Sequence, residues 1–177
     1  IILAAGMGRR IAAGAAGTPK PLLPLDDSGL TFIDWHVRSL RAQGVREIFF
    51  VGSPATFGKA EGGKWIMNDF PGDQSGSGHS AHLAFTSRHD ILDGNSRVVL
   101  MDADIVYDPS IYAALTKSTR SKTLVCSKYR ETHEEVMVFG ESAKTPRMHG
   151  KGLLGTPMTR GLTCLGEATG ILLLEPE

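Results

Sequence analysis

The chain has 177 residues, in which 19 Lys and Arg balance 19 Asp and Glu, so its formal net charge is zero. This balance argues against a general nucleic-acid binder or a membrane-surface binder, because both usually carry a basic excess. A chain of this length is most simply one domain with a single core, and we expect one domain over residues 1–177.

The first predicted strand, residues 1–3, runs into a segment with two glycines that ends in two arginines. Its residues are Leu3, Ala4, Ala5, Gly6, Met7, Gly8, Arg9 and Arg10. Glycine lets the main chain pass close to a phosphate with its N–H groups pointing inward. Arg10, together with Lys20 between two prolines, supplies the positive charge that three phosphates require. These residues predict a site for a nucleoside triphosphate.

Other glycine-loop sites fit this segment less well. A dinucleotide-binding loop needs a third glycine where Ile11 stands. Asp26 lies at the right distance for a ribose ligand, but the prolines between residues 19 and 24 deny the intervening stretch a regular helix. A Walker-type loop needs Gly-Lys-Ser/Thr, and no such triplet follows Gly8. A plain surface turn with basic residues remains the simplest alternative.

The next elements alternate between helical and strand patterns. Residues 31–43 are expected to form a helix that is capped by Thr31 and ends at Gly44. Strands are expected at residues 47–51 and 64–67, and a polar, glycine-rich loop at 69–79 leads into a helix from about residue 80 to 88. His79 and His82 are read as ordinary polar positions, because no other cluster supports a zinc site.

An acidic cluster, Asp102-Ala103-Asp104, follows the predicted strand at residues 97–101. Two carboxylates two residues apart on an extended chain point to the same side. Mg²⁺ prefers one or two carboxylates together with phosphate oxygens and water. We therefore predict Asp104 as the main Mg²⁺ ligand, with Asp102 supporting it directly or through water. Asp108 is read as the N-cap of a helix that Pro109 opens.

The remaining chain carries predicted strands at residues 123–127, 135–139 and 171–174, and residues 140–166 are read as loops with room for one hairpin. This alternation predicts an α/β domain with a mostly parallel sheet. Ligands of such sheets bind at the carboxyl ends of the strands. The glycine segment and the acidic cluster should therefore share one rim.

Cys126 and Cys164 form no C-x-x-C pair, which predicts neither a disulfide framework nor a zinc knuckle. The apolar runs are too short to span a bilayer, and no signal-peptide pattern opens the chain. We expect a cytoplasmic setting, with no nucleic acid and no membrane as partners. Both ends of the chain fall beside strand-like runs, so we expect the domain to be incomplete at its C-terminus and open to fusion in a longer chain.

Two coupled blocks resemble the signature of the sugar-phosphate and alcohol-phosphate nucleotidylyltransferases, L-A-A-G-x-G-x-R followed by P-K-P-L. Residues 3–10 match the first block and residues 19–22 match the second. A third block, Gly166 to Ile171, resembles the G-E-x-x-G-I segment of the phosphocholine and phosphonate cytidylyltransferase branch. The resemblance implies a Rossmann-like, GT-A-type nucleotidyltransferase fold with flanking helices.

The resemblance also implies roles for individual residues. The catalytic residues would be Lys20, on the α-phosphate and acceptor, Arg10, on the leaving pyrophosphate, and Asp104, on Mg²⁺. The bound nucleotide would contact residues 3–10 and Lys20, and its base and ribose would lie beside Ser77, Gly78 and Ser80. The acceptor would contact Lys151 through its phosphate and Glu167 through its ammonium group or metal-bound water. The family's usual second metal ligand would lie C-terminal to residue 177.

The expected function is therefore Mg²⁺-dependent transfer of a nucleotidyl group, favouring CMP from CTP, to a small phosphonate or alcohol phosphate, with release of pyrophosphate. A sugar-1-phosphate nucleotidylyltransferase that uses UTP, GTP or dTTP is the alternative enzyme. A nucleotide-binding regulatory domain without turnover is the alternative of another class, although the presence of Arg10, Lys20 and Asp104 counts against it. The oligomeric state stays open.

Overall fold

The computed structural model describes residues 1–6, 17–70, 76–87, 95–129 and 135–176. The chain divides into two compact units. The first unit contains Ile1–Lys122 and Leu172–Glu177, and the second contains Thr123–Ile171.

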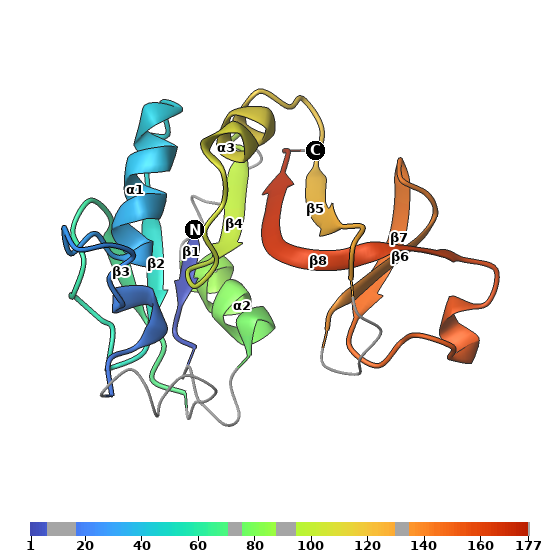
Figure 1. The fold of residues 1–177 in the computed structure, drawn as a ribbon, viewed down its shortest axis with the longest axis horizontal. Helices are drawn as coiled ribbons and strands as arrows, with labels where there is room; N and C mark the ends of the chain where they lie inside the picture. Colours follow the sequence, from blue (N-terminus) through green and yellow to red (C-terminus); the bar gives the residue numbers. More distant parts are fainter. Residues whose placement is uncertain (7–16, 71–75, 88–94, 130–134, 177) are drawn as a thin grey trace. The chain divides into compact units, whose positions relative to one another are not determined.

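The first unit is built on parallel strands in the order β3-β2-β1-β4 (Figure 1). These strands are β1 (Ile2–Ala4), β2 (Phe49–Gly52), β3 (Lys64–Met67) and β4 (Val98–Asp102). The order continues to β8 (Thr163–Leu174), whose last three residues belong to this unit. In register, Leu3 lies opposite Val51 on one side and Asp102 on the other. The glycine segment and the acidic cluster therefore leave the sheet at the same edge, as predicted.

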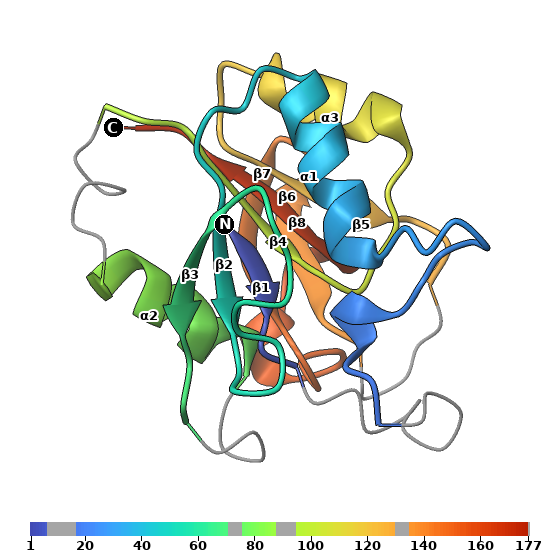
Figure 2. The ribbon, with the colours of Figure 1, turned by 90° about the vertical axis from the view of Figure 1, so that its left-hand side faces the viewer.

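Helices cover both faces of this sheet. Helices α1 (Phe32–Ala42) and α3 (Pro109–Thr116) lie on one face, and α2 (Ser77–Ser87) lies on the other (Figure 2). Where α2 packs on the sheet, the core contains Ala84 of the helix together with Ile1, Phe49, Val51 and Val98. A short 3₁₀ helix, η1 (Lys20–Leu22), precedes α1.

The predicted helix caps are confirmed. Thr31 caps α1 and forms a reciprocal capping box with Asp34, and Gly44 follows the helix with a φ of 80°. Asp108 caps α3 by accepting a hydrogen bond from the Ser110 N–H at 2.8 Å. The prediction for α2 was wrong at its start, because the helix begins at Ser77 instead of residue 80. Glycine at its second position hid the first turn, since glycine is a poor helix former.

The second unit is antiparallel. Strand β6 (Met137–Ser142) pairs with β7 (Thr145–Gly150) and with β8, while β5 (Lys122–Cys126) pairs with β8; a 3₁₀ helix, η3 (Pro157–Thr159), follows β7. The expected hairpin is β6–β7. The prediction of loops over residues 140–166 is confirmed for residues 151–162, which contain turns and η3, and was wrong for β7 and the start of β8. β7 is mostly exposed and polar, so it lacks the apolar alternation that marks a strand.

The α/β class is confirmed, and the antiparallel pairing of the second unit makes the strand arrangement mixed instead of mostly parallel. Within the described ranges, no helix combines the length and the apolar character that a bilayer crossing requires.

Candidate functional site

One ion pair joins the acidic cluster to Lys20, which belongs to the second of the two sequence blocks, residues 19–22. The Lys20 Nζ atom lies 3.1 Å from the Asp104 Oδ2 atom, although 84 residues separate them. Lys20 opens η1, and Asp104 follows the end of β4 by two residues. Their side chains are 25 % and 36 % exposed. Because water reaches both groups, the Lys20 ammonium can exchange its partner for a phosphate oxygen, and the Asp104 carboxylate can exchange its partner for a cation.

Asp102 is the last residue of β4 and adds a second carboxyl to this rim. Burial, and then the negative charge of Asp104, raise the pKa of Asp102 to about 6. A cation between the two carboxylates would relieve this repulsion. Among the described residues, no group of three or more His, Cys, Asp or Glu could hold a metal ion. Two carboxylates completed by substrate phosphates suit Mg²⁺, which dehydrates reluctantly and takes few protein ligands.

The raised pKa predicts how stability depends on pH when no metal is bound. The folded state binds the Asp102 proton more tightly than the unfolded state, so this carboxyl destabilises the fold as pH rises from about 4 to 6. Asp102→Asn should therefore raise the free energy of unfolding at pH 7.5 by on the order of 1–2 kcal/mol, a value discounted for partial exposure. Below pH 4 no gain is expected.

Urea unfolding in the presence of a chelator, at pH 7.5 and pH 4, measures this difference. Asp108→Asn is the matched control. The hydrogen bond from the Ser110 hydroxyl lowers the pKa of Asp108, so this substitution should give no gain in stability at pH 7.5. Equal stability of wild type and Asp102→Asn at pH 7.5 would show that the ionised Asp102 carboxyl does not destabilise the fold.

A buried aromatic cluster lies beside the acidic residues. His36 of α1 is fully buried, and its Nδ1 atom is joined to the Tyr112 Oη atom by a hydrogen bond of 2.7 Å. The ring of Tyr107 lies 6.0 Å from the rings of both His36 and Tyr112. Burial lowers the pKa of His36 to about 4, so its ring is neutral near pH 7. His36 was not predicted, because a histidine on the apolar face of a helix carries no local signal of its partners.

The start of the glycine segment is held by a buried threonine. Leu3 and Ala4 belong to β1, and Ala5 and Gly6 follow it. The Thr56 Oγ1 atom, fully buried, lies 3.1 Å from the Ala4 carbonyl oxygen and can donate to it. Thr56 was not predicted, because it follows β2 and lies 52 residues along the chain from Ala4. The other predicted nucleotide-binding residues of this segment, namely Met7, Gly8, Arg9 and Arg10, lie outside the described residues.

The first turn of α2 contains the three residues that were predicted beside the base and ribose. Ser77 and Gly78 are exposed, whereas Ser80 is buried. The Ser80 Oγ atom accepts a hydrogen bond of 3.0 Å from the Asn68 Nδ2 atom, at the end of β3. Ser80 thus ties β3 to α2, and the exposed Ser77 is better placed to meet a ligand.

In the second unit, the strand register relates the predicted acceptor residue Glu167 to Gly150, the residue before Lys151. Met137 of β6 lies opposite Gly150 of β7 on one side and opposite Glu167 of β8 on the other. Lys151 directly follows Gly150 and is exposed. Residues in one row of a sheet are about 4.8 Å apart per strand, so Gly150 and Glu167 are separated by about 10 Å.

The glycine before Glu167 has a structural reason. Gly166 has a φ of 142°, and a Cβ atom on it would approach the Cys126 carbonyl oxygen to 2.5 Å. Only glycine allows β8 to lie this close to β5 at that point. Packing therefore requires glycine at position 166, and the next residue, Glu167, adds a half-buried carboxyl.

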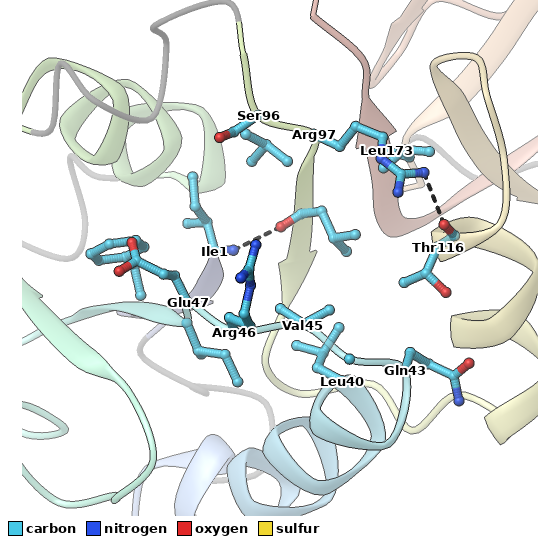
Figure 3. Close-up of a pocket in the computed structure, with 15 residues that line it drawn as sticks. Ile1, Leu40, Gln43, Val45, Arg46, Glu47, Ser96, Arg97, Thr116 and Leu173 are labelled. Carbon is cyan, nitrogen blue, oxygen red and sulfur yellow. Dashed lines mark hydrogen bonds between the residues drawn. The ribbon is translucent and has the colours of Figure 1, made fainter.

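A pocket of about 430 Å³ lies at the other edge of the parallel sheet (Figure 3). Its lining includes the first residues of β2 and β4, Ile1 just before β1, and the segment that follows α1. None of the predicted site residues lines it. Its carboxylate, Glu47, lies 3.2 Å from the Lys64 ammonium. The pocket therefore stands apart from the rim that carries Lys20 and Asp104.

The fold and sequence have known relatives. A family model described as MobA-like NTP transferase domain matches residues 1–156. The CTP:phosphocholine cytidylyltransferase from Streptococcus pneumoniae is similar with a TM-score of 0.66 and 16% identity, covering 98% of this chain and 69% of that one. The inositol-1-phosphate CTP transferase from T. maritima has a TM-score of 0.67 and 18% identity, with 98% and 69% covered. A putative glucose-1-phosphate thymidylyltransferase from Bacillus anthracis has a TM-score of 0.68 and 19% identity, with 99% and 70% covered.

Proposed function

The chain belongs to the MobA-like NTP transferase family, and we propose that it is a cytidylyltransferase that uses CTP and Mg²⁺. It transfers CMP to a small phosphonate or alcohol phosphate and releases pyrophosphate. The observation that carries the proposal is the contact between Lys20 and Asp104, which joins a predicted phosphate-binding cation to a predicted metal ligand.

The proposed reaction is an in-line displacement at phosphorus. An oxygen of the acceptor attacks the α-phosphorus, and the bond from that phosphorus to the oxygen that bridges to the β-phosphate breaks. Such chemistry needs positioning and charge neutralisation more than a covalent nucleophile. Lys20 is proposed to contact both the α-phosphate and the acceptor, where its charge stabilises the five-coordinate phosphorus. Arg10 and the main-chain N–H groups of residues 5–10 are proposed to bind the triphosphate.

Asp104, supported by Asp102, is proposed to hold Mg²⁺. The bound cation supplies charge neutralisation on the phosphate oxygens. Asp104 contributes further by holding the Lys20 ammonium at 3.1 Å before substrate arrives. This contact restricts the Lys20 side chain before substrate binds, which reduces the side-chain entropy lost when it binds phosphate.

The charges of the two proposed acceptor residues favour a zwitterionic acceptor. Lys151, which is exposed, would bind a phosphonate or phosphate group, and Glu167, which is half-buried, would bind an ammonium group. One cation and one anion match the opposite charges of 2-aminoethylphosphonate or phosphocholine better than a sugar phosphate, which has no ammonium group. This match favours the cytidylyltransferase over the sugar-1-phosphate alternative.

Pyrophosphate release tests the proposal directly. CTP, UTP, GTP, ATP and dTTP are each combined with 2-aminoethylphosphonate, phosphocholine or glucose-1-phosphate in the presence of Mg²⁺. Release with CTP and a zwitterionic acceptor is the expected result. Release with glucose-1-phosphate alone would move the protein to the sugar-1-phosphate enzymes, and nucleotide binding without any release would favour a regulatory domain.

Glu167→Gln tests the acceptor assignment. The variant keeps the size of the side chain but loses its charge, so KM for 2-aminoethylphosphonate should rise about 10-fold, as expected for a lost hydrogen bond to a charged group. With ethylphosphonate, which lacks the ammonium group, wild type and variant should be equally active. Glu141→Gln is the control, because Glu141 is exposed and pairs with Arg147 at 2.8 Å. Equal KM values in wild type and Glu167→Gln would remove Glu167 from the acceptor site.

A further inference from the structure

The loop that carries Asp104 is fixed at both ends and exposed between them. At its start, the Ala103 N–H donates to the Leu3 carbonyl at 3.1 Å, and Ala103 is buried. At its end, Tyr107 is buried, at 4 % exposure. Ile105 and Val106 between them are 36 % and 48 % exposed. The position of Asp104 therefore depends on how firmly these two ends are held.

The far end of this loop is held by a tryptophan of α1. The Trp35 Nε1 atom donates a hydrogen bond of 3.1 Å to the carbonyl oxygen of Tyr107. The Tyr107 ring then packs against His36, which follows Trp35 on the same helix. Helix α1 thus holds both the main chain and the side chain of Tyr107, three residues after Asp104.

The same end of α1 also holds the segment that carries Lys20. Thr31, the N-cap of α1, forms an antiparallel bridge with Pro24, and the Leu25 N–H donates to the Leu30 carbonyl at 2.7 Å. Lys20 lies just before this turn, in η1. The first turn of α1 is consequently the common support of both partners in the Lys20–Asp104 pair.

We propose that Trp35 is a positioning residue for the nucleotidyl transfer site, because its hydrogen bond to Tyr107 fixes the Asp104 loop against the helix that also supports Lys20. This inference rests on the proposed role of Asp104 as a metal ligand. Trp35 itself is not proposed to contact a reacting atom. Its effect should appear in how the protein responds to Mg²⁺ and in the mobility of residues 103–107.

Trp35→Phe removes the indole N–H, and with it the hydrogen bonds to the Tyr107 carbonyl and to the Tyr112 side chain, and keeps an aromatic ring. The chain offers a matched control in its other tryptophan, since the Trp65 Nε1 atom donates to the Ala60 carbonyl over the same 3.1 Å. Both indoles are half-buried in the first unit. Trp35→Phe and Trp65→Phe should therefore lose similar amounts of global stability, which thermal unfolding of both variants checks.

Two readouts separate positioning from folding. The Mg²⁺ concentration for half-maximal turnover should rise about 10-fold in Trp35→Phe, as for other residues that orient metal ligands. The maximal rate at saturating Mg²⁺ and the KM for CTP should stay within about two-fold. Amide hydrogen exchange of residues 103–107 should also become faster. Neither change is expected in Trp65→Phe.

Identical Mg²⁺ dependence and identical exchange at residues 103–107 in the two variants would overturn the role of Trp35. Wild-type protein that shows no turnover with any nucleotide and acceptor would instead overturn the proposed function. In that case faster exchange confined to Trp35→Phe would still establish that Trp35 fixes the loop.

Discussion

Asp104→Asn is expected to lower Mg²⁺-dependent turnover by about 10³-fold or more, because it removes the main carboxylate ligand of a cation that neutralises the phosphates. The substitution keeps the size of the side chain. It also removes the negative charge that helps raise the pKa of Asp102, so it should not unfold the protein. Steady-state rates of pyrophosphate release across a Mg²⁺ titration measure the effect.

Asp108→Asn is the control for this experiment. Asp108 lies four residues further on and caps α3, and Asn is as good an N-cap as Asp. Its turnover should equal that of wild type. If Asp104→Asn kept a normal rate and a normal Mg²⁺ requirement, the metal assignment would have to move to Asp102.

Lys20→Ala is expected to lower turnover by about 10²–10³-fold, the usual cost of losing one group that stabilises transition-state charge. Nucleotide binding should largely survive, because residues 3–10 are proposed to bind the triphosphate as well. The expected result is thus a large loss in kcat with a small change in the dissociation constant for CTP. Rapid-quench kinetics together with calorimetric titration of CTP separate the two quantities.

Lys64→Ala provides a matched comparison, since Lys64 also forms an ion pair, with Glu47 at 3.2 Å, but on β3 away from the acidic cluster. Its kcat and its affinity for CTP should match those of wild type. Unchanged turnover in Lys20→Ala would remove Lys20 from the mechanism, whereas equal losses of binding and turnover would make it a binding residue only.

The sequence predicted those parts of the site that depend on local pattern. The apolar run of β1, the capped helix α1 and the acids at the end of β4 each carry a short-range signal, and strand ends in a parallel sheet meet at one edge. That edge was therefore predictable, and the structure adds the contact between Lys20 and Asp104. The contact itself had no local signal, because it depends on how η1 folds back beside the end of β4.

The residues that were missed carry buried or half-buried polar groups whose partners lie far along the chain. Thr56 reaches Ala4 across 52 residues, Trp35 reaches Tyr107 across 72, and His36 reaches Tyr112 across 76. A single sequence shows the type of such a residue but not its partner. Ser80 was predicted beside the base and ribose, and its hydrogen bond from Asn68 was likewise not visible in the sequence.

Strands β5 and β6 were predicted, whereas β7 and the first residues of β8 were missed for a different reason. β7 contains a proline and a glycine, and the start of β8 contains a glycine; both residue types are typical of turns and loops. Strand β6 pairs with β7 on one side and with β8 on the other, and this pairing stabilises both as strands in spite of that composition. Tertiary hydrogen bonding therefore overrides weak local preference in this unit.

Phosphorus NMR of one reaction mixture tests the central claim most directly. Wild-type protein is incubated with CTP, Mg²⁺ and 2-aminoethylphosphonate, and the fate of every phosphorus atom is followed. We expect the acceptor phosphonate to become coupled to the α-phosphorus of CMP while pyrophosphate appears in equal amount. Formation of CDP and orthophosphate, or recovery of unchanged CTP from active, folded protein, would contradict the proposed reaction.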